Sequence, residues 1–146
     1  MKCVSVFQPW ASLLVGGGRR YETRGWAPAH RGILGIHASR KFPYDWQLRC
    51  EREPVKSALR ALGFASRLDL PRGVLLGTVE LVDVIPADRV NLEEGEQAFG
   101  DFRPGRYAWK VANPTPLAIP LRMGGRLGIY EVALDLLRSG QAAGVS

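Results

Sequence analysis

Short stretches of alternating or clustered hydrophobic residues predict strands and short helices along the first third of the chain. Residues 2–7 alternate and predict a strand. Pro9 suits a helix start, and the apolar residues 10–15 predict a short helix that the following glycines end. Residues 20–26 have an extended pattern, and residues 33–38 form an apolar run typical of a buried strand.

The rest of the chain predicts more helices first and then more strands. Residues 43–49 and 54–62 each begin with a proline and predict two short helices, the second ended by Gly63. Residues 73–84 are rich in β-branched side chains and predict a strand closed by Pro86. Asn91 is expected to cap a short helix that reaches Phe99. The remaining predicted strands are 107–112 and 117–123, while 130–137 fits a strand or a helix.

The composition predicts one α+β domain, which we place at residues 1–138, followed by a flexible tail at 139–146. The chain has 146 residues with 17 glycines and 10 prolines, which favours short elements over a long helical bundle. Cys3 and Cys50 stand far apart and only two histidines are present, so we expect no zinc site, no disulfide framework and no cofactor. We expect a cytoplasmic protein, without a secretory leader or a membrane span.

Positive charge is concentrated early in the chain. The net charge is +6, and the cations of residues 17–41 outnumber the single carboxylate there, Glu22. Such a patch is typical of a site for nucleic acid or phosphate. A solvated basic face that keeps the protein soluble explains the charge equally well.

Four motifs, taken together and in order, resemble the ASCH domain of the PUA-like superfamily. They are Gln8-Pro9-Trp10, the segment from Gly17 to Trp26, Arg31-Gly32 leading into His37-Ala38-Ser39, and Gly105-Arg106-Tyr107-Ala108-Trp109. One position departs from the family pattern, because Arg19 stands where the family usually has lysine.

The resemblance implies a small β-barrel with short helices packed around it. It also implies a cleft lined by the motif residues that binds RNA or a modified nucleoside. One activity in the family, hydrolysis of the acetyl amide of acetylcytidine, uses a Lys, a Thr and a Glu, whose positions fall on Arg19, Glu22 and Glu80. Arginine cannot lose its proton near neutral pH, so this mechanism is not expected here. Other members are ribonucleases, which leaves phosphodiester cleavage open.

Strand alternation groups the candidate binding residues around residues 20–26. It places Arg20, Glu22 and Arg24 on one face and Arg19, Tyr21 and Thr23 on the other. Glu22 and Arg24 either contact a ligand in the cleft, with Arg24 clamping a phosphate or base edge, or form a buried pair that holds the sheet. The full set of candidate ligand-binding residues is Trp10, Arg19, Tyr21, Glu22, Arg24, Trp26, His37, Ser39, Lys41, Arg106 and Tyr107.

Several of these candidates also have structural explanations. Trp10 and Trp26 could stack on a base or anchor the core, and Trp109 could complete the cleft or be structural. His37 could be a hydrogen-bonded structural residue, and Glu80 could face solvent on the sheet. Our first hypothesis is therefore a module that binds RNA, another single-stranded nucleic acid or a nucleoside. The rivals are a ribonuclease or nucleoside amidohydrolase that uses Glu22 or Glu80 as base, and a protein-binding adaptor.

Overall fold

The computed structural model describes residues 1–133 and 135, which build one mixed sheet with short helices. The strands are β1 (Lys2–Val6), β2 (Tyr21–Arg24), β3 (Gly32–Ala38), β4 (Val74–Pro86), β5 (Tyr107–Arg122) and β6 (Ile129–Glu131). The helices are α1 (Trp10–Val15), α2 (Tyr44–Arg49) and α3 (Val55–Ala61), with 3₁₀ turns η1 (Arg67–Asp69) and η2 (Glu96–Phe99). The predicted α+β class is confirmed.

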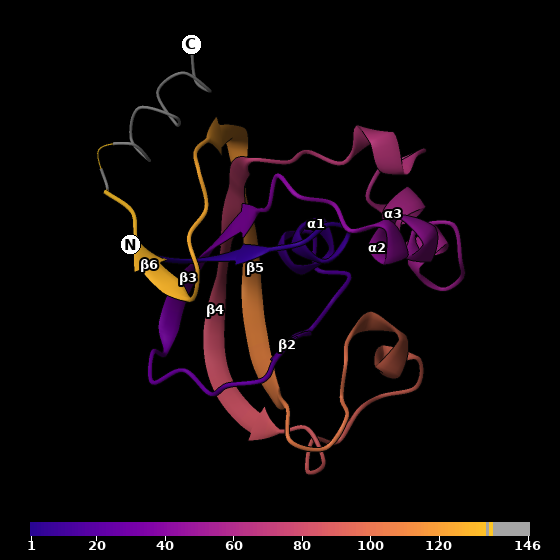
Figure 1. The fold of residues 1–146 in the computed structure, drawn as a ribbon, viewed down its shortest axis with the longest axis vertical. Coiled ribbons are helices and arrows are strands. Elements are labelled where there is room, and N and C mark those ends of the chain that lie inside the picture. Colours follow the sequence, from indigo (N-terminus) through magenta and orange to yellow (C-terminus); the bar gives the residue numbers. More distant parts are fainter. Residues whose placement is uncertain (134, 136–146) are drawn as a thin grey trace.

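The six strands form a curled sheet in the order β2-β5-β4-β3-β1-β6 (Figure 1). β1 and β3 pair in parallel, and the other neighbours are antiparallel. A parallel pair needs a crossover, which α1 and β2 supply between β1 and β3. The parallel pairing brings the carboxyl ends of β1 and β3 to the same edge of the sheet, and the segments that follow both strands therefore start side by side.

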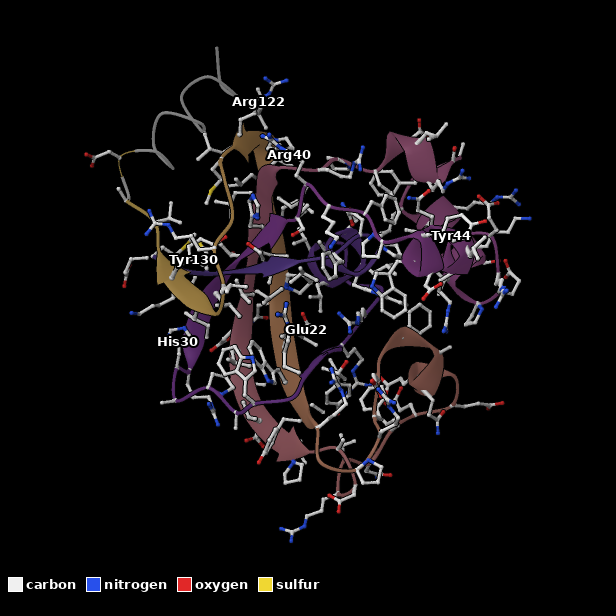
Figure 2. The ribbon with its side chains drawn as sticks, in the orientation of Figure 1. Glu22, His30, Arg40, Tyr44, Arg122 and Tyr130 are labelled. Carbon is white, nitrogen blue, oxygen red and sulfur yellow. The ribbon has the colours of Figure 1, made fainter. Side chains whose placement is uncertain are left out.

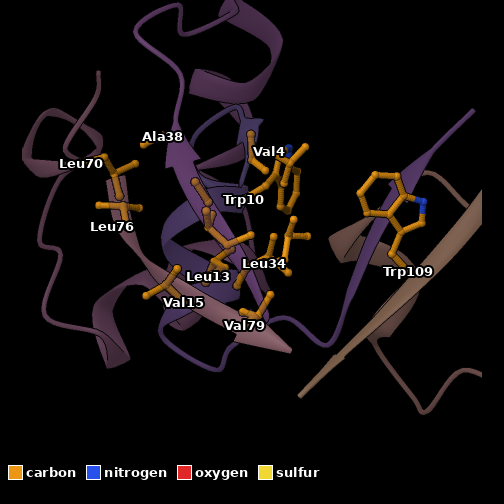
Figure 3. Close-up of a cluster of buried hydrophobic side chains, with 14 of the residues drawn as sticks. Val4, Trp10, Leu13, Val15, Leu34, Ala38, Leu70, Leu76, Val79 and Trp109 are labelled. Carbon is orange, nitrogen blue, oxygen red and sulfur yellow. The ribbon is translucent and has the colours of Figure 1, made fainter. Parts of the chain in front are cut away.

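Helix α1 is buried on all its residues and packs against the sheet (Figure 1). Its leucines meet Val4, Leu34 and Val79 from three strands in the main hydrophobic cluster (Figure 3). The buried Gln8 side chain closes the start of this helix: its Oε1 accepts from the Ser12 amide at 3.0 Å, and its Nε2 donates to the Pro71 carbonyl at 2.7 Å. The Gln-Pro-Trp motif thus anchors the helix.

The helices between β3 and β4 confirm two of the three helix predictions made for the middle of the chain. α2 and α3 begin after Pro43 and Pro54, as expected. Gly63 follows α3 with φ of 93°, the left-handed conformation that ends a helix. The helix predicted from Asn91 is wrong in its start: only the turn η2 forms, and it begins after Gly95, whose φ of 87° prevents a longer helix from continuing through it.

The two strands predicted at 107–112 and 117–123 are one long strand, β5. The intervening prolines suggest a turn, but the pairing with β4 only shifts register there, and Asn113 takes a φ of 51° at the shift. β2 pairs with only the first four residues of β5. Beyond them, β5 contains Pro114, Pro116 and Pro120, and no other described strand covers its outer edge.

The ambiguous segment at 130–137 begins as a strand, β6, which pairs with β1. The tail predicted at 139–146 lies outside the described residues. Among residues 1–133 and 135, no helix is both long and apolar enough to cross a bilayer. In the same part of the chain, no group of three or more His, Cys, Asp or Glu side chains is placed to hold a metal ion.

Candidate functional site, a basic cleft

A cleft of about 1030 Å³ opens beside the carboxyl ends of β1 and β3. It is lined by these strand ends, by β2, by α2, by the segment between η2 and β5, and by residues 123–128, which we call the glycine loop. Eight cationic side chains line this cleft against two carboxylates, Glu22 and Asp101. The cations are Arg19, Arg24, Arg40, Lys41, Arg49, Arg103, Arg106 and Arg126.

The Glu22 carboxylate forms the floor of the cleft, near the centre of the molecule (Figure 2). Its Oε1 accepts from Arg19 Nη1 and from the Thr23 amide, both at 2.9 Å. Its Oε2 accepts from Arg24 Nε at 3.1 Å and from Arg24 Nη2 at 3.0 Å. A carboxylate has about four lone-pair sites, and here all four are used by the chain itself.

Glu22 is charged despite being only 5% exposed. Burial would raise the pKa of this carboxyl, but Arg19 and Arg24 outweigh burial and hold its pKa below the ordinary value. Burial lowers the pKa of the Arg19 guanidinium, although Glu22 opposes this. Arginine is not deprotonated in proteins near neutral pH, so Arg19 stays charged. Glu22 is therefore an anchor for two arginines and has little capacity to act as a base.

Strand alternation fails at the residues just before β2. Arg19 was expected on the face opposite Glu22, yet its guanidinium bonds to Glu22 and lies 5.1 Å from the Trp10 ring centre. Arg20 was expected beside Glu22 but instead pairs with Glu93 and Glu96 away from the cleft. The reason is that β2 starts only at Tyr21, so the two-residue period does not extend to positions 19 and 20.

A second polar cluster, made by His37, Ser5 and Tyr130, joins three neighbouring strands beside the glycine loop. His37 Nε2 donates to the Met123 carbonyl at 2.8 Å, which leaves Nδ1 as the acceptor for the Ser5 hydroxyl at 3.0 Å. Ser5 Oγ lies 2.8 Å from the Tyr130 hydroxyl. Burial lowers the pKa of His37, and Arg40 lowers it further, against the opposing effect of the Met123 carbonyl. The neutral ring fits this bonding pattern.

Gly125 brings the glycine loop against this cluster. A Cβ atom at residue 125 would lie 2.4 Å from Ser5 Oγ and 2.9 Å from His37 Nδ1, closer than real Cβ atoms approach. Only glycine therefore fits without moving the loop. The contact and the His37 bond to Met123 together hold Arg126 at the rim of the cleft.

We expect the stability of the fold to fall as the pH drops below about 6.5, because His37 is neutral in the fold and protonates in the unfolded chain. The pKa of His37 is lower in the fold than in the unfolded chain, so the unfolded chain binds more protons as the pH falls below about 6.5. The stabilisation that the neutral His37 gives the fold is therefore complete only above about pH 6.5. Denaturant unfolding of the wild type and of His37→Gln at about pH 7.5 and about pH 5 measures this effect.

The wild type should lose more stability than His37→Gln between these two pH values. Glu22 and Asp101 also have lowered pKa values, with that of Asp101 about 2, but carboxyls titrate below the window used here. Equal losses in both proteins would contradict the assignment of His37 as the titrating group.

Four of the eight cations that line the cleft form ion pairs with carboxylates of the described residues, and the other four do not. Arg19 and Arg24 pair with Glu22, while Arg103 and Arg106 pair with Asp101. The other four make no ion pair with any residue that the structure describes. These four, which we call the rim cations, are Arg40, Lys41, Arg49 and Arg126.

The structure brings most of the predicted binding residues together at this cleft. Those that line it are Trp10, Arg19, Glu22, Arg24, His37, Ser39, Lys41 and Arg106. Tyr21 is buried against Phe102, Trp26 packs edge-on against Trp109, and Tyr107 packs on the core, so none of these three lines the cleft. Glu80 also lies outside it and accepts a hydrogen bond from Asn113 at 2.7 Å.

Several lining residues were missed by the sequence analysis. Arg49, Arg103 and Arg126 come from α2, the segment after η2 and the glycine loop, which are far apart in the sequence. Phe7, the aromatic residue before the Gln-Pro-Trp motif, was also missed and lines the cleft. A local signal that could have identified the glycine loop is the glycine-rich run Gly124-Gly125-Arg126-Leu127-Gly128, which contains one arginine.

Comparison with known proteins gives two similar curated relatives. Activating signal cointegrator 1 of Homo sapiens is 43% identical over 133 residues, which are 89% of this chain and 22% of that protein. The protein of the same name from Mus musculus is 42% identical, with the same coverage. The chain thus spans about a fifth of the length of the curated relatives it matches.

Solved structures with the same fold are ASCH proteins. The crystal structure of ASCH from Zymomonas mobilis has a TM-score of 0.52 at 12% identity, covering 94% of this chain and 90% of that one. A mutant of that protein has a TM-score of 0.53 at 11% identity, covering 94% of both chains. This likeness confirms the expected PUA-like fold. The sequence model of the ASCH domain matches residues 4–120, and the chain therefore belongs to the ASCH-domain family.

Proposed function

We propose that this protein binds RNA through the basic cleft. The observation that carries the proposal is the set of four rim cations, which face the cleft without a carboxylate partner among the described residues. Unpaired cations around one concave site favour an anionic ligand, and phosphate groups on a backbone are spaced closely enough to meet several of them. Ser39, between β3 and Arg40, adds a hydroxyl that can donate to a phosphate.

Binding is better supported than hydrolysis in this cleft. A general base needs a free lone pair near the substrate, and the chain occupies all four sites of Glu22. Glu80, the other carboxylate that the sequence suggested as a base, lies outside the cleft. Asp101 lines the cleft but is paired with Arg103 and Arg106. These three facts favour a module that holds its ligand without reacting with it.

The proposal predicts that affinity for a single-stranded oligoribonucleotide falls steeply with salt. Each phosphate neutralised should contribute about −0.7 to the slope of log affinity against log salt. Arg126→Ala or Arg49→Ala should weaken binding and make the slope shallower by about 0.7 each. Fluorescence anisotropy at several salt concentrations measures both quantities.

Arg89→Ala is the matched control, since Arg89 is exposed in the turn after β4 and does not line the cleft. It removes the same charge and should leave the slope unchanged. An affinity that does not depend on salt, or equal effects of Arg89→Ala and Arg126→Ala, would reject the cleft as the binding site.

A further inference from the structure

Phe7 is an aromatic side chain that the core does not use. It is 38% exposed and lines the cleft, although its neighbours Val6 and Gln8 are buried. Phe7 follows the last residue of β1, and Val6 is in register with Ala38 at the end of β3. The Ser39 amide donates to the Val6 carbonyl at 2.9 Å. The fold thus places Phe7 beside the segment Ser39-Arg40-Lys41.

Other apolar side chains line the same cleft among the cations. Trp46 of α2 is half-buried, with its ring 5.6 Å from that of Trp10 in an edge-on arrangement. Leu127 in the glycine loop is 98% exposed. An anionic ligand without a flat apolar part would need the cations only. The mixture of exposed aromatic and cationic side chains fits a nucleotide, which has both a phosphate and a base with two π-faces.

The hydrogen-bonding groups of the cleft floor restrict how a base can be recognised. Glu22 has no lone pair left for a base amino group, and the carbonyl of Met123 is bonded to His37. In the proposed function, the rim cations and Ser39 donate to phosphate. Stacking therefore remains as the main way to hold a base, and stacking discriminates little between bases because each has a π-face.

We infer that Phe7 is a base-stacking residue and that the cleft binds unpaired nucleotides in preference to duplex. The inference rests on the proposed function and adds to it the strandedness of the RNA. Bases within a duplex are already stacked on their neighbours and cannot cover the Phe7 ring, whereas an unpaired base can. The rim cations hold the phosphates on either side of that base.

The test compares three probes by anisotropy: an oligouridylate of about ten nucleotides, a blunt RNA duplex of the same length, and inorganic polyphosphate as competitor. The wild type should bind the single strand more tightly than the duplex. Phe7→Leu should weaken binding of the single strand by about 5- to 150-fold, the range expected for losing one stacked base. The affinity for polyphosphate, calculated from the competition curves, should be nearly unchanged in Phe7→Leu. Phe7→Trp should retain the affinity of the wild type for the single strand.

Tyr44→Leu is the matched control. Tyr44 is 70% exposed on α2, apart from Glu22 and not lining the cleft (Figure 2). Its loss should not change any of the three affinities, and melting curves show whether each variant is folded.

Three results would overturn the inference while leaving the proposed function intact. They are equal affinity for duplex and single strand, unchanged single-strand binding by folded Phe7→Leu, and a parallel loss of polyphosphate binding in Phe7→Leu, because stacking does not act on polyphosphate. If the wild type bound neither RNA probe, the proposed function and the inference would fail together.

Discussion

Replacing Glu22 with glutamine is expected to lower the free energy of unfolding by about 3–5 kcal/mol. Arg19 would keep its charge in a buried site, with the neutral amide of residue 22 as its nearest former partner. Removing one member of a buried ion pair is costly because the remaining charge has neither water nor a counter-charge. Denaturant unfolding, followed by circular dichroism, measures the change.

The double variant Arg19→Met with Glu22→Met tests the same explanation if the single variant fails to fold. It removes both buried charges and keeps apolar volume, so it should be more stable than Glu22→Gln. Glu93→Gln is a surface control, since Glu93 pairs with Arg20 in solvent and should matter little. If Glu22→Gln and Glu93→Gln had the same free energy of unfolding, the Arg19–Glu22 pair would not be isolated from water.

Arg24→Ala is expected to reduce affinity for single-stranded RNA about tenfold or more, and also to destabilise the fold moderately. Arg24 Nη2 donates to Glu22 and, at 2.7 Å, to the Ser5 carbonyl, so its loss leaves two acceptors with fewer partners. The side chain is partly exposed and lines the cleft, where a charged hydrogen bond to phosphate would account for the tenfold effect. Titration of the oligouridylate measures the affinity, and melting curves measure the stability.

Arg24→Lys is the informative comparison for this prediction. Lysine keeps the charge but cannot form the paired hydrogen bonds to Glu22. The affinity of Arg24→Lys for the oligouridylate should therefore lie between the affinities of the wild type and Arg24→Ala. If folded Arg24→Ala bound RNA as the wild type does, Arg24 would be a structural residue only. The sequence suggested either a ligand contact or a buried pair for Glu22 and Arg24. The two roles are compatible, because the Arg24 guanidinium bonds to the buried Glu22 carboxylate and also lines the cleft.

Most strands could be predicted because their hydrophobic pattern is local and is bounded by proline or glycine. β4 shows this: its β-branched residues and the closing Pro86 mark both its type and its end. β5 could not be predicted as one strand because Asn113, Pro114 and Pro116 look like a turn. They are tolerated since a register shift absorbs them and no strand pairs with that outer edge in the described part of the chain.

The part of the candidate site that could be predicted comes from the family motifs and from the basic segment, and it includes Trp10, His37, Ser39 and Arg106. Glu22 and Arg24 lie on a short motif, and the basic segment around them gave Arg19 and Lys41. Arg49, Arg103 and Arg126 were missed because they reach the cleft through tertiary packing, which local patterns do not encode. Phe7 was missed for a related reason: its exposure depends on the strand edge beside it, and an aromatic residue in an apolar strand normally predicts core.

The prolines on β5 have a consequence for how this edge of the sheet meets other polypeptide chains. A long uncovered strand edge is a template for the addition of a foreign strand, which leads to misassembly. Pro114, Pro116 and Pro120 have no amide hydrogen to donate, so this stretch of β5 offers fewer backbone donors to an approaching strand. The edge therefore protects itself against strand exchange with neighbouring polypeptide, without needing a covering element.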